Sequence, residues 1–176
     1  MDLMKISIIK DNIKLRPIRA EDKNDIFNEF TDEIVTYMIP PVPKDIDETI
    51  DFIESSIATM EAGLNIQLCI TDNDTGEFLG CIGLHRIDKD IPEFGIWLKK
   101  GAQGKKIGRK SIEMLYKYAC DNLDHKAFKY PVDKRNVPSR KIPESLGGIV
   151  FNYEPHERPV GEPLDVAVYH IEAKRN

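Results

Sequence analysis

A glycine-rich stretch past the middle of the chain carries the residues best suited to bind an anion. It contains three glycines and three side chains with amide or ammonium groups: Gly101, Gln103, Gly104, Lys105, Lys106 and Gly108. Apolar residues at three- and four-residue steps over 112–123 predict that the stretch opens a helix. A helix N-terminus offers free backbone N–H groups and a positive dipole, and glycines permit close approach. With Arg109 adding charge, the stretch is typical of a phosphate or pyrophosphate site.

Spacing alone leaves open which phosphate-bearing ligand this stretch would bind. A Walker-type loop ends in Gly-Lys-Ser/Thr, an order that Gly108-Arg109-Lys110-Ser111 lacks. A dinucleotide-binding loop usually opens the first strand–helix unit of a chain, whereas several strand-like runs precede this one. A nucleotide-binding module and a plain structural turn therefore remain alternatives at this point.

Three motifs in a fixed order favour a more specific interpretation. The run Gln103-Gly104-Lys105-Lys106-Ile107-Gly108 resembles the Q/R-x-x-G-x-G/A loop with which N-acetyltransferases of the GNAT superfamily bind acyl-CoA pyrophosphate. Residues 92–98 are similar to the AEIGYWL strand of the subgroup that contains ribosomal-protein N-terminal acetyltransferases. The segment from Asn136 to Ser139, followed by Leu146-Gly147, is similar to the N-x-x-S … GF segment of that subgroup. The resemblance covers roughly the C-terminal half, and the N-terminal half agrees in layout.

The resemblance implies roles for individual residues. Glu93 would take the proton of the acceptor amine or only bind that amine, with a water molecule as the alternative base. Ser139 would protonate the leaving thiolate or only cap a helix. Tyr153 and Tyr169 are alternative proton donors, and Asn136 would hydrogen-bond the pantetheine arm. The residues implied to bind acetyl-CoA, the first three through their backbone, are Ile96, Trp97, Leu98, Gln103, Gly104, Lys105, Lys106, Ile107, Gly108, Arg109, Asn136 and Ser139.

The implied reaction is direct acetyl transfer from acetyl-CoA to a primary amine, at a peptide or protein N-terminus or on a small molecule. The amine must be neutral and close to the thioester carbon, the carbonyl oxygen needs stabilisation, and the thiolate needs a proton. Residues 36–44 between the first two helices would help to form the acceptor side. The alternative within the same fold is a non-catalytic sensor that binds acyl-CoA without turnover.

The elements that must position these residues follow from the apolar patterns. Strands are expected at 13–18, 65–71, 77–86, 93–100, 126–132, 149–153 and 164–171, and helices at 21–30, 45–62, 109–122 and 136–146. A short apolar piece at 6–9 adds to the first strand or pairs elsewhere. The resemblance implies an α/β (α+β) fold: a mixed, mostly antiparallel sheet of about seven strands with helices on both faces.

In that fold two central parallel strands splay apart, and the pantetheine arm lies in the wedge between them. Pro131 cannot donate to a ladder, so its strand should be unpaired on one side at that point. Gly95 would allow the bulge that starts the splay. Pro143 lies inside the last expected helix and should kink it or end it early. Gly148 stands where the family usually has an aromatic residue, which puts the local packing in question.

Composition bounds the class of protein. The 176 residues are 41% hydrophobic and 31% charged, which indicates one domain over residues 1–176. A net charge of −5 argues against nucleic acid as a partner. No long apolar run predicts a membrane span, and the first residues lack a signal-peptide pattern. Cys69, Cys81 and Cys120 are scattered, which is typical of reduced thiols in a cytoplasmic protein.

Cofactor and partner expectations follow. The four histidines, His85, His125, His156 and His170, are not at metal-ligand spacing, so no metal is expected. The expected partners are acetyl-CoA and an amine-bearing acceptor, with no membrane partner. The protein is expected to be a monomer or a homodimer.

Overall fold

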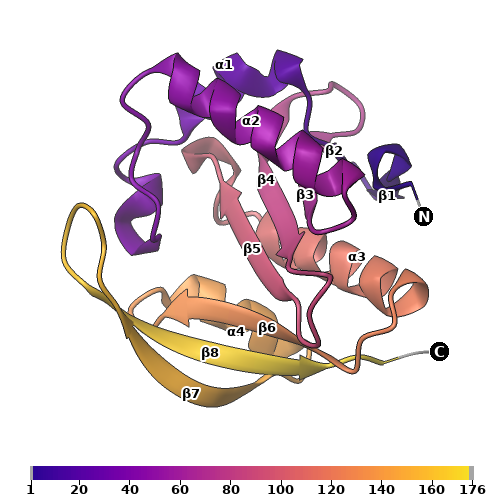
Figure 1. Ribbon diagram of the computed structural model, residues 1–176, viewed down its shortest axis with the longest axis vertical. Helices are drawn as coiled ribbons and strands as arrows, with labels where there is room; N and C mark the ends of the chain where they lie inside the picture. Colours follow the sequence, from indigo (N-terminus) through magenta and orange to yellow (C-terminus); the bar gives the residue numbers. More distant parts are fainter. Residues whose placement is uncertain (1, 175–176) are drawn as a thin grey trace.

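The computed structural model describes residues 2–174, in which eight strands form one sheet with helices on both faces (Figure 1). The strands are β1 Ile8–Lys10, β2 Ile13–Pro17, β3 Ile66–Asp72, β4 Phe78–His85, β5 Glu93–Leu98, β6 Ala127–Asp133, β7 Ile149–His156 and β8 Leu164–Glu172. Their order is β1-β2-β3-β4-β5-β6-β8-β7, and only the β5–β6 pair is parallel. The predicted mixed, mostly antiparallel sheet is confirmed, and the short N-terminal apolar piece contributes the extra strand β1.

The helices divide between the two faces of the sheet (Figure 1). They are α1 Lys23–Glu29, α2 Ile46–Glu61, α3 Ile107–Asn122 and α4 Val137–Ser145, with 3-10 turns η1 Leu3–Lys5, η2 Ala20–Asp22, η3 Ile34–Tyr37 and η4 Lys100–Ala102. The apolar side of α3 buries Ile112, Leu115 and Ala119 in the main core. A second cluster around Ile53 of α2 covers the opposite face. Within residues 2–174, no helix has the length and apolar character that a membrane crossing requires.

The central feature of the sheet is that β5 and β6 touch at one point. Their parallel ladder contains a single Cα pair, Glu93 with Lys129, and Lys129 N donates to Pro92 O at 2.7 Å. Two residues further on, the same edge of β6 presents Pro131, which has no N–H to donate. The two strands diverge from there toward their carboxyl ends (Figure 1). The unpaired edge predicted at Pro131 is confirmed.

The divergence does not start at a bulge in β5. β4 and β5 pair without a register shift from Gly80–Leu98 to His85–Glu93. The prediction of a bulge at Gly95 is therefore wrong, because the missing rung is on the β6 side. Gly95 instead leaves room for a ring: a Cβ built there would lie 3.2 Å from Nε2 of His85.

The end of α4 explains a departure from the family pattern. Pro143 lies in the last turn, and the helix ends two residues later at Ser145. Gly148 N donates back to Pro143 O at 2.8 Å. A Cβ at position 148 would lie 2.7 Å from that same oxygen. The close return of the chain thus excludes the aromatic residue that the family usually carries there.

Candidate active site

The N-terminus of α3 is built to face an anion. The helix starts after Lys106, which adopts a left-handed conformation with φ 62° and supplies no side-chain cap. Gly104 has φ 75°, and a Cβ added to it would meet nothing within 4 Å. The N–H groups of a first helical turn have no intrahelical acceptor and mark the positive end of the helix dipole. The turn therefore presents open, donor-rich backbone toward solvent.

Two of the three predicted cations are free to meet a ligand there. Nε of Arg109 donates to Glu113 at 3.0 Å, so its charge is already partnered along the helix. Lys105 and Lys106 are exposed and form no ion pair with any residue from 2 to 174. These two ammonium groups, together with the uncapped helix, fit the charge of a diphosphate.

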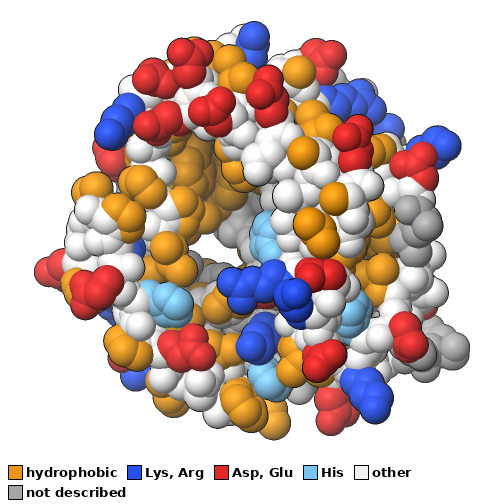
Figure 2. Space-filling view, in the orientation of Figure 1, with side chains coloured by type: hydrophobic (Ala, Val, Ile, Leu, Met, Phe, Trp, Pro, Cys, Tyr) orange, Lys and Arg blue, Asp and Glu red, His pale blue; other side chains and the backbone are white. Residues whose placement is uncertain are grey.

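The wedge between β5 and β6 lies directly beside this turn. One edge of β5 pairs with β4 as far as Leu98, whereas its other edge has no strand partner after Glu93. Gly108 lies where three elements meet, because its Cβ position is 3.4 Å from Leu98 Cδ1 and 3.6 Å from Ile142 Cδ1. Figure 2 shows that this face of the molecule is hollowed, with hydrophobic side chains along the walls. An extended ligand arm can thus find both apolar walls and unpaired backbone groups.

The remaining predicted cofactor residues surround the wedge. Nε2 of Gln103 donates to Leu98 O at 3.3 Å, which ties the turn to the end of β5. The side chain of Ile96 packs with Leu98 against the main core. Trp97 points to the other face, where its ring lies 4.9 Å from that of Phe30. Backbone groups alternate along a strand, so those of Ile96 and Leu98 point to the free edge of β5, whereas those of Trp97 point to β4.

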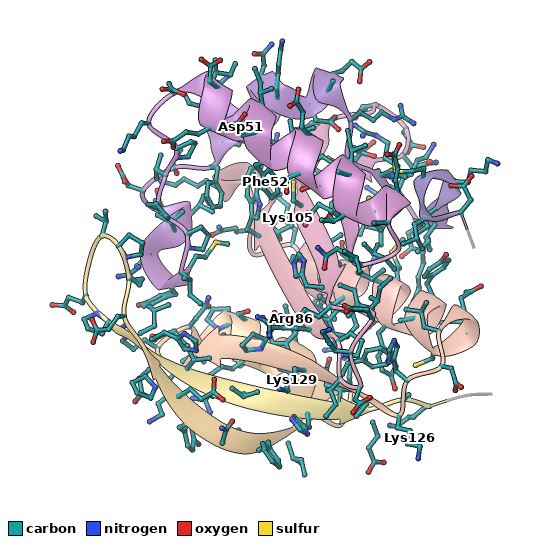
Figure 3. All side chains as sticks on the ribbon, viewed as in Figure 1. Asp51, Phe52, Arg86, Lys105, Lys126 and Lys129 are labelled. Atoms are coloured by element: carbon teal, nitrogen blue, oxygen red, sulfur yellow. The ribbon has the colours of Figure 1, made fainter. Side chains whose placement is uncertain are left out.

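Glu93 lies at the opposite end of β5 from the turn. Five residue steps separate it from Leu98, which is about 17 Å along an extended strand. It shares a sheet face with its ladder partners His85 and Lys129, the face covered by α2. Figure 3 shows Lys129 close to Arg86, and both line one surface pocket beside the start of β5.

Ser139 approaches the wedge from the other face. Tyr130 follows Lys129 in β6, so its side chain points away from Glu93, and its hydroxyl lies 2.8 Å from Oγ of Ser139 in α4. Burial raises the pKa of Tyr130 to about 12, against a smaller opposing effect of the Ser139 hydrogen bond. The phenol is therefore protonated at neutral pH and can donate to Ser139. The two predicted catalytic residues thus lie on opposite sides of the wedge.

The structure also shows what the other candidates contact. Asn136 is the N-cap of α4, and its Oδ1 accepts from Ser139 N at 3.3 Å. Tyr169 is buried, and its hydroxyl donates to Glu144 at 2.7 Å. Tyr153 is 54% exposed on the edge strand β7. Tyr153 thus has no part in the contact between Ser139 and Tyr130, whereas Tyr169 is the ladder partner of Tyr130 and lies beside it on the same face of the sheet.

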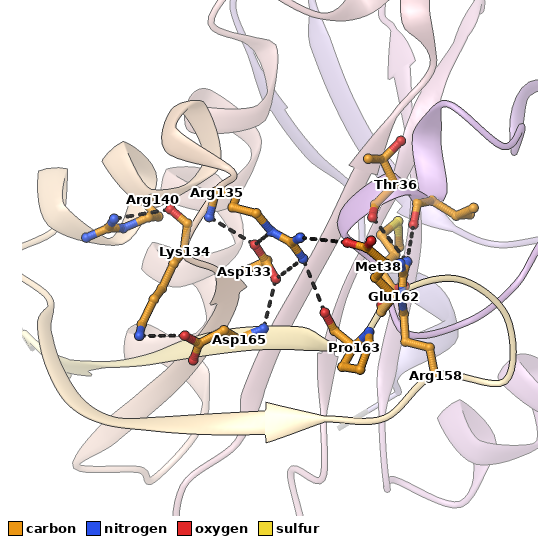
Figure 4. Close-up of polar contacts among 11 residues, drawn as sticks. Thr36, Met38, Asp133, Lys134, Arg135, Arg140, Arg158, Glu162, Pro163 and Asp165 are labelled. Atoms are coloured by element: carbon orange, nitrogen blue, oxygen red, sulfur yellow. Dashed lines mark hydrogen bonds and ion pairs between the residues drawn. The ribbon is translucent and has the colours of Figure 1, made fainter.

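One residue that the sequence did not single out joins two segments that are far apart in the chain. Arg158, in the loop between β7 and β8, donates through Nη1 to three main-chain oxygens of the segment at η3: Val35 at 3.2 Å, Thr36 at 3.1 Å and Met38 at 3.3 Å. Figure 4 shows this contact beside the network around Asp133 at the end of β6. Arg158 thereby ties the β7–β8 loop to a segment about 120 residues earlier in the chain.

The described residues also include side chains that could act as metal ligands. Among residues 2–174, no group of three or more His, Cys, Asp and Glu side chains is placed to hold a metal ion.

Comparisons with known proteins agree with this geometry. The model of the Acetyltransferase (GNAT) domain matches residues 12–149. A curated relative, the uncharacterized N-acetyltransferase p20 of Bacillus licheniformis, is 23% identical over 172 residues, which cover 94% of this chain and 95% of the relative.

Two solved structures with bound CoA share the fold. The ribosomal L7/L12 alpha-N-protein acetyltransferase RimL in complex with coenzyme A superposes with a TM-score of 0.85 at 17% identity, covering 96% of this chain and 100% of RimL. Spermidine N-acetyltransferase from Vibrio cholerae, in complex with CoA and spermine, has a TM-score of 0.80 at 18% identity and covers 93% and 97% of the two chains.

Proposed function

The chain belongs to the GNAT family of acetyltransferases, and we propose that it transfers the acetyl group of acetyl-CoA directly to a primary amine, at a peptide or protein N-terminus or on a small molecule. The observation that carries this proposal is that the ladder between β5 and β6 contains one residue pair, Glu93 with Lys129, after which the strands separate and form a wedge. Its unpaired edge opens beside the uncapped N-terminus of α3. A sheet interrupted in this way leaves backbone groups that a bound ligand must satisfy.

The residues of the turn would hold the diphosphate end of the cosubstrate. The N–H groups of residues 104–109 would donate to its oxygens, and Lys105 and Lys106 would neutralise its charge. Gln103, through its bond to Leu98 O, keeps the turn against β5. Backbone groups of Ile96 and Leu98 would meet the pantetheine arm. When bound, the cosubstrate supplies the reactive acetyl thioester.

The two faces of the wedge would divide the proton chemistry. Glu93 lies on the α2 side, where it would bind the acceptor ammonium or take its proton, so that a neutral amine is formed. The amine nitrogen then bonds to the acetyl carbon, the carbon–sulfur bond breaks, and the nitrogen loses its surplus proton to solvent, which leaves a neutral amide. Ser139, supported by the protonated phenol of Tyr130, would give the leaving sulfur its proton from the α4 side.

The acceptor would enter between η3 and the β7–β8 loop. Arg158 fixes the main chain of residues 35–38 there, and the ring of Tyr37 faces the guanidinium of Arg135 at 5.4 Å. The acceptors of relatives differ: RimL acts on the N-terminus of ribosomal protein L7/L12, and spermine is bound in the spermidine enzyme. Both amine classes therefore belong to the proposal for this chain.

Glu93→Gln should lower kcat/KM about 100-fold, because the amide can neither bind an ammonium as a counter-charge nor accept its proton. CoA affinity measured by calorimetry should stay within about twofold of wild type, because Glu93 is at the far end of β5 from the turn. Glu61→Gln, an exposed carboxylate at the end of α2, is the matched control and should leave both quantities unchanged. Equal kcat/KM in Glu93→Gln and Glu61→Gln would show that Glu93 takes no part in the reaction.

Ser139→Ala should lower kcat about 10-fold and leave the acceptor KM unchanged, because the lost hydroxyl acts on the leaving sulfur. Ser145→Ala removes a hydroxyl that donates to Ile142 O, at 2.7 Å, in the same helix. This control should be silent. If Ser139→Ala is as fast as Ser145→Ala, another group must give the leaving sulfur its proton.

The proposed function is tested by thiol release from acetyl-CoA over a panel of amines. The panel should contain a peptide with an N-terminal serine, spermine and an aromatic amine, with the acetylated product identified by mass. We expect release that depends on one amine class. Acetyl-CoA binding without release on any amine would instead support the non-catalytic sensor.

A further inference from the structure

The imidazole of His85 lies beside Glu93, and the sequence analysis gave it no catalytic role. His85 ends β4 and is the ladder partner of Glu93, so both side chains project from the same face of the sheet. This face looks toward α2. Any acceptor amine that reaches Glu93 from this side also comes close to the His85 ring.

Two glycines make the space that the ring occupies. A Cβ at Gly83 would lie 2.8 Å from Cε1 and Nε2 of His85, and a Cβ at Gly95 would lie 3.2 Å from Nε2. These glycines are ladder partners on the adjoining strands β4 and β5. Neither has a positive φ, so no turn or bulge explains them. Because both residues lack a side chain, the sheet surface at Gly83 and Gly95 is bare backbone, and the imidazole of His85 lies on it.

A cavity of about 170 Å³ opens on the other side of the ring, between α2 and the sheet. It is lined by His85 and by uncharged residues of α2 and β3 and the residue before β3: Phe52, Ser55, Ser56, Thr59, Asn65 and Gln67. Figure 3 shows Phe52 on α2, with Arg86 at the end of β4. A cavity of this size and polarity can hold water molecules. Water there would connect the imidazole with solvent.

The state of the imidazole suits a base. Its ring nitrogens have no hydrogen-bond partner among residues 2–174. Burial lowers the pKa of His85, the Glu93 carboxylate opposes this shift, and Arg86 adds to it. The ring is therefore neutral at physiological pH. An ordinary carboxylate has a pKa near 4.3 and an ordinary imidazole one near 6.5, so the imidazole is intrinsically the stronger base of the two.

We propose that His85 is a catalytic residue that accepts the proton of the acceptor ammonium, while the Glu93 carboxylate holds that ammonium in place. The N–H bond of the ammonium breaks, a new N–H bond forms on the imidazole, and the neutral amine keeps the electron pair for attack on the acetyl carbon. The imidazolium beside Glu93 then returns its proton to solvent through the cavity. This assignment rests on the proposed acetyl transfer and divides two tasks that sequence left with Glu93 alone.

Few other charges face the His85 ring. The lining of the cavity from α2 and β3 contains no titratable group. Arg86 follows His85 in the chain, and Lys129 lies across the β5–β6 pair from Glu93. Arg86 disfavours a positive charge on His85 in the resting enzyme, whereas Glu93 favours that charge once a proton arrives. The pH dependence expected below is therefore that of His85 under the influence of Arg86 and Glu93.

His85→Gln should lower kcat/KM about 100-fold and remove the fall in rate on the acid side of the pH profile. In the wild type that fall should occur below pH 6.5, because protonated His85 cannot accept a proton. His170→Gln is the matched control: burial also lowers the pKa of His170, but this ring stacks on Phe151 at 4.2 Å and lies on β8, which β6 separates from the β5–β6 wedge. The control should keep the wild-type rate and profile. Equal rates and equal acid limbs in the two variants would overturn the proposal.

A second pair of measurements does not depend on an acceptor or on His85→Gln folding. Nuclear magnetic resonance should give a His85 pKa below 6.5 in the free protein, and Glu93→Gln should lower it further by removing the favourable charge. A pKa of 6.5 that Glu93→Gln leaves unchanged would show that the His85 ring and the Glu93 carboxylate do not interact.

Gly83→Ala, which presses a methyl group onto the His85 ring, should reduce kcat several-fold with CoA affinity preserved. A wild-type kcat in Gly83→Ala would also count against the proposal.

The outcomes separate this proposal from the proposed function. If amines are acetylated and Glu93→Gln is slow while His85→Gln is as fast as His170→Gln, the transferase assignment stands and the assignment of His85 fails. If acetyl-CoA binds but no amine in the panel is acetylated, the proposed function fails, and the resonance titration still decides whether His85 and Glu93 interact.

Discussion

Gly104→Asp is expected to weaken CoA binding about 30- to 100-fold, or roughly 2–2.7 kcal/mol. The added carboxylate would stand in the open turn before α3, where the proposed diphosphate lies, and like charges a few ångström apart repel strongly in a partly desolvated site. The aspartate would also have to adopt the φ of 75° that Gly104 has. Calorimetry with CoA measures the effect directly.

A matched control separates charge at the site from backbone strain. Gly76, in the turn between β3 and β4, has φ 76°, and a Cβ there also meets nothing within 4 Å. Gly76→Asp therefore introduces the same charge and the same conformational cost at a distant place. It should lower thermal stability as much as Gly104→Asp and leave CoA affinity unchanged. Equal losses of affinity in both variants would mean that the turn before α3 does not bind the diphosphate.

Asp133→Asn is expected to destabilise the protein by about 2 kcal/mol, because this carboxylate organises the end of β6. Its side chain has no exposed surface, and it accepts four hydrogen bonds, three from Arg135 and one from Asp165 N at 3.0 Å (Figure 4). Hydrogen bonds to a buried charge are worth more than neutral ones, and an asparagine keeps only part of them. The solvent access of Arg135 keeps the expected loss below that of a fully buried pair.

The pH dependence of this loss follows from the direction of the pKa shift. Burial alone would raise the pKa of Asp133, but the hydrogen bonds from Arg135 and Asp165 outweigh it and hold the pKa below its ordinary value. Such a group stabilises the fold above the unfolded pKa, near 3.9, and the contribution disappears as pH falls through the folded pKa. Denaturant unfolding should therefore show the full difference between wild type and Asp133→Asn at pH 6 and a shrinking difference below pH 4.

Asp165→Asn is the control within the same network. The Asp165 carboxylate pairs with Lys134 at 2.6 Å, but both side chains are largely solvent-accessible. An exposed pair contributes at most about 1 kcal/mol. A loss in Asp165→Asn as large as that in Asp133→Asn would contradict the view that burial gives Asp133 its importance.

Sequence predicted the parts of the site that depend on local chemistry. The glycines and cations of the turn indicated a phosphate site because helix termini and glycine backbones have properties that do not depend on the rest of the fold. Pro131 predicted an unpaired strand edge because a missing N–H is missing in any environment. Both features lie where the wedge is found.

The remaining parts depend on contacts between distant segments. Gly95 in a strand is compatible with a bulge or with the close approach of a side chain, and only the position of His85 distinguishes the two. Arg158 lies in a loop without periodicity, and its partners at Val35, Thr36 and Met38 are more than a hundred residues away. No local pattern connects such residues, so neither contact could be predicted.

The most direct test of the account is amide hydrogen exchange, resolved by residue, with and without CoA. If the wedge and the turn bind the cosubstrate, CoA should slow exchange at Ile96 and Leu98, whose amides point to the free edge of β5, and at residues 104–109 before and within the first turn of α3. Amides of the β3–β4 turn around Gly76 should be unaffected. CoA binding that leaves Ile96, Leu98 and residues 104–109 exchanging at their free rates would contradict the account.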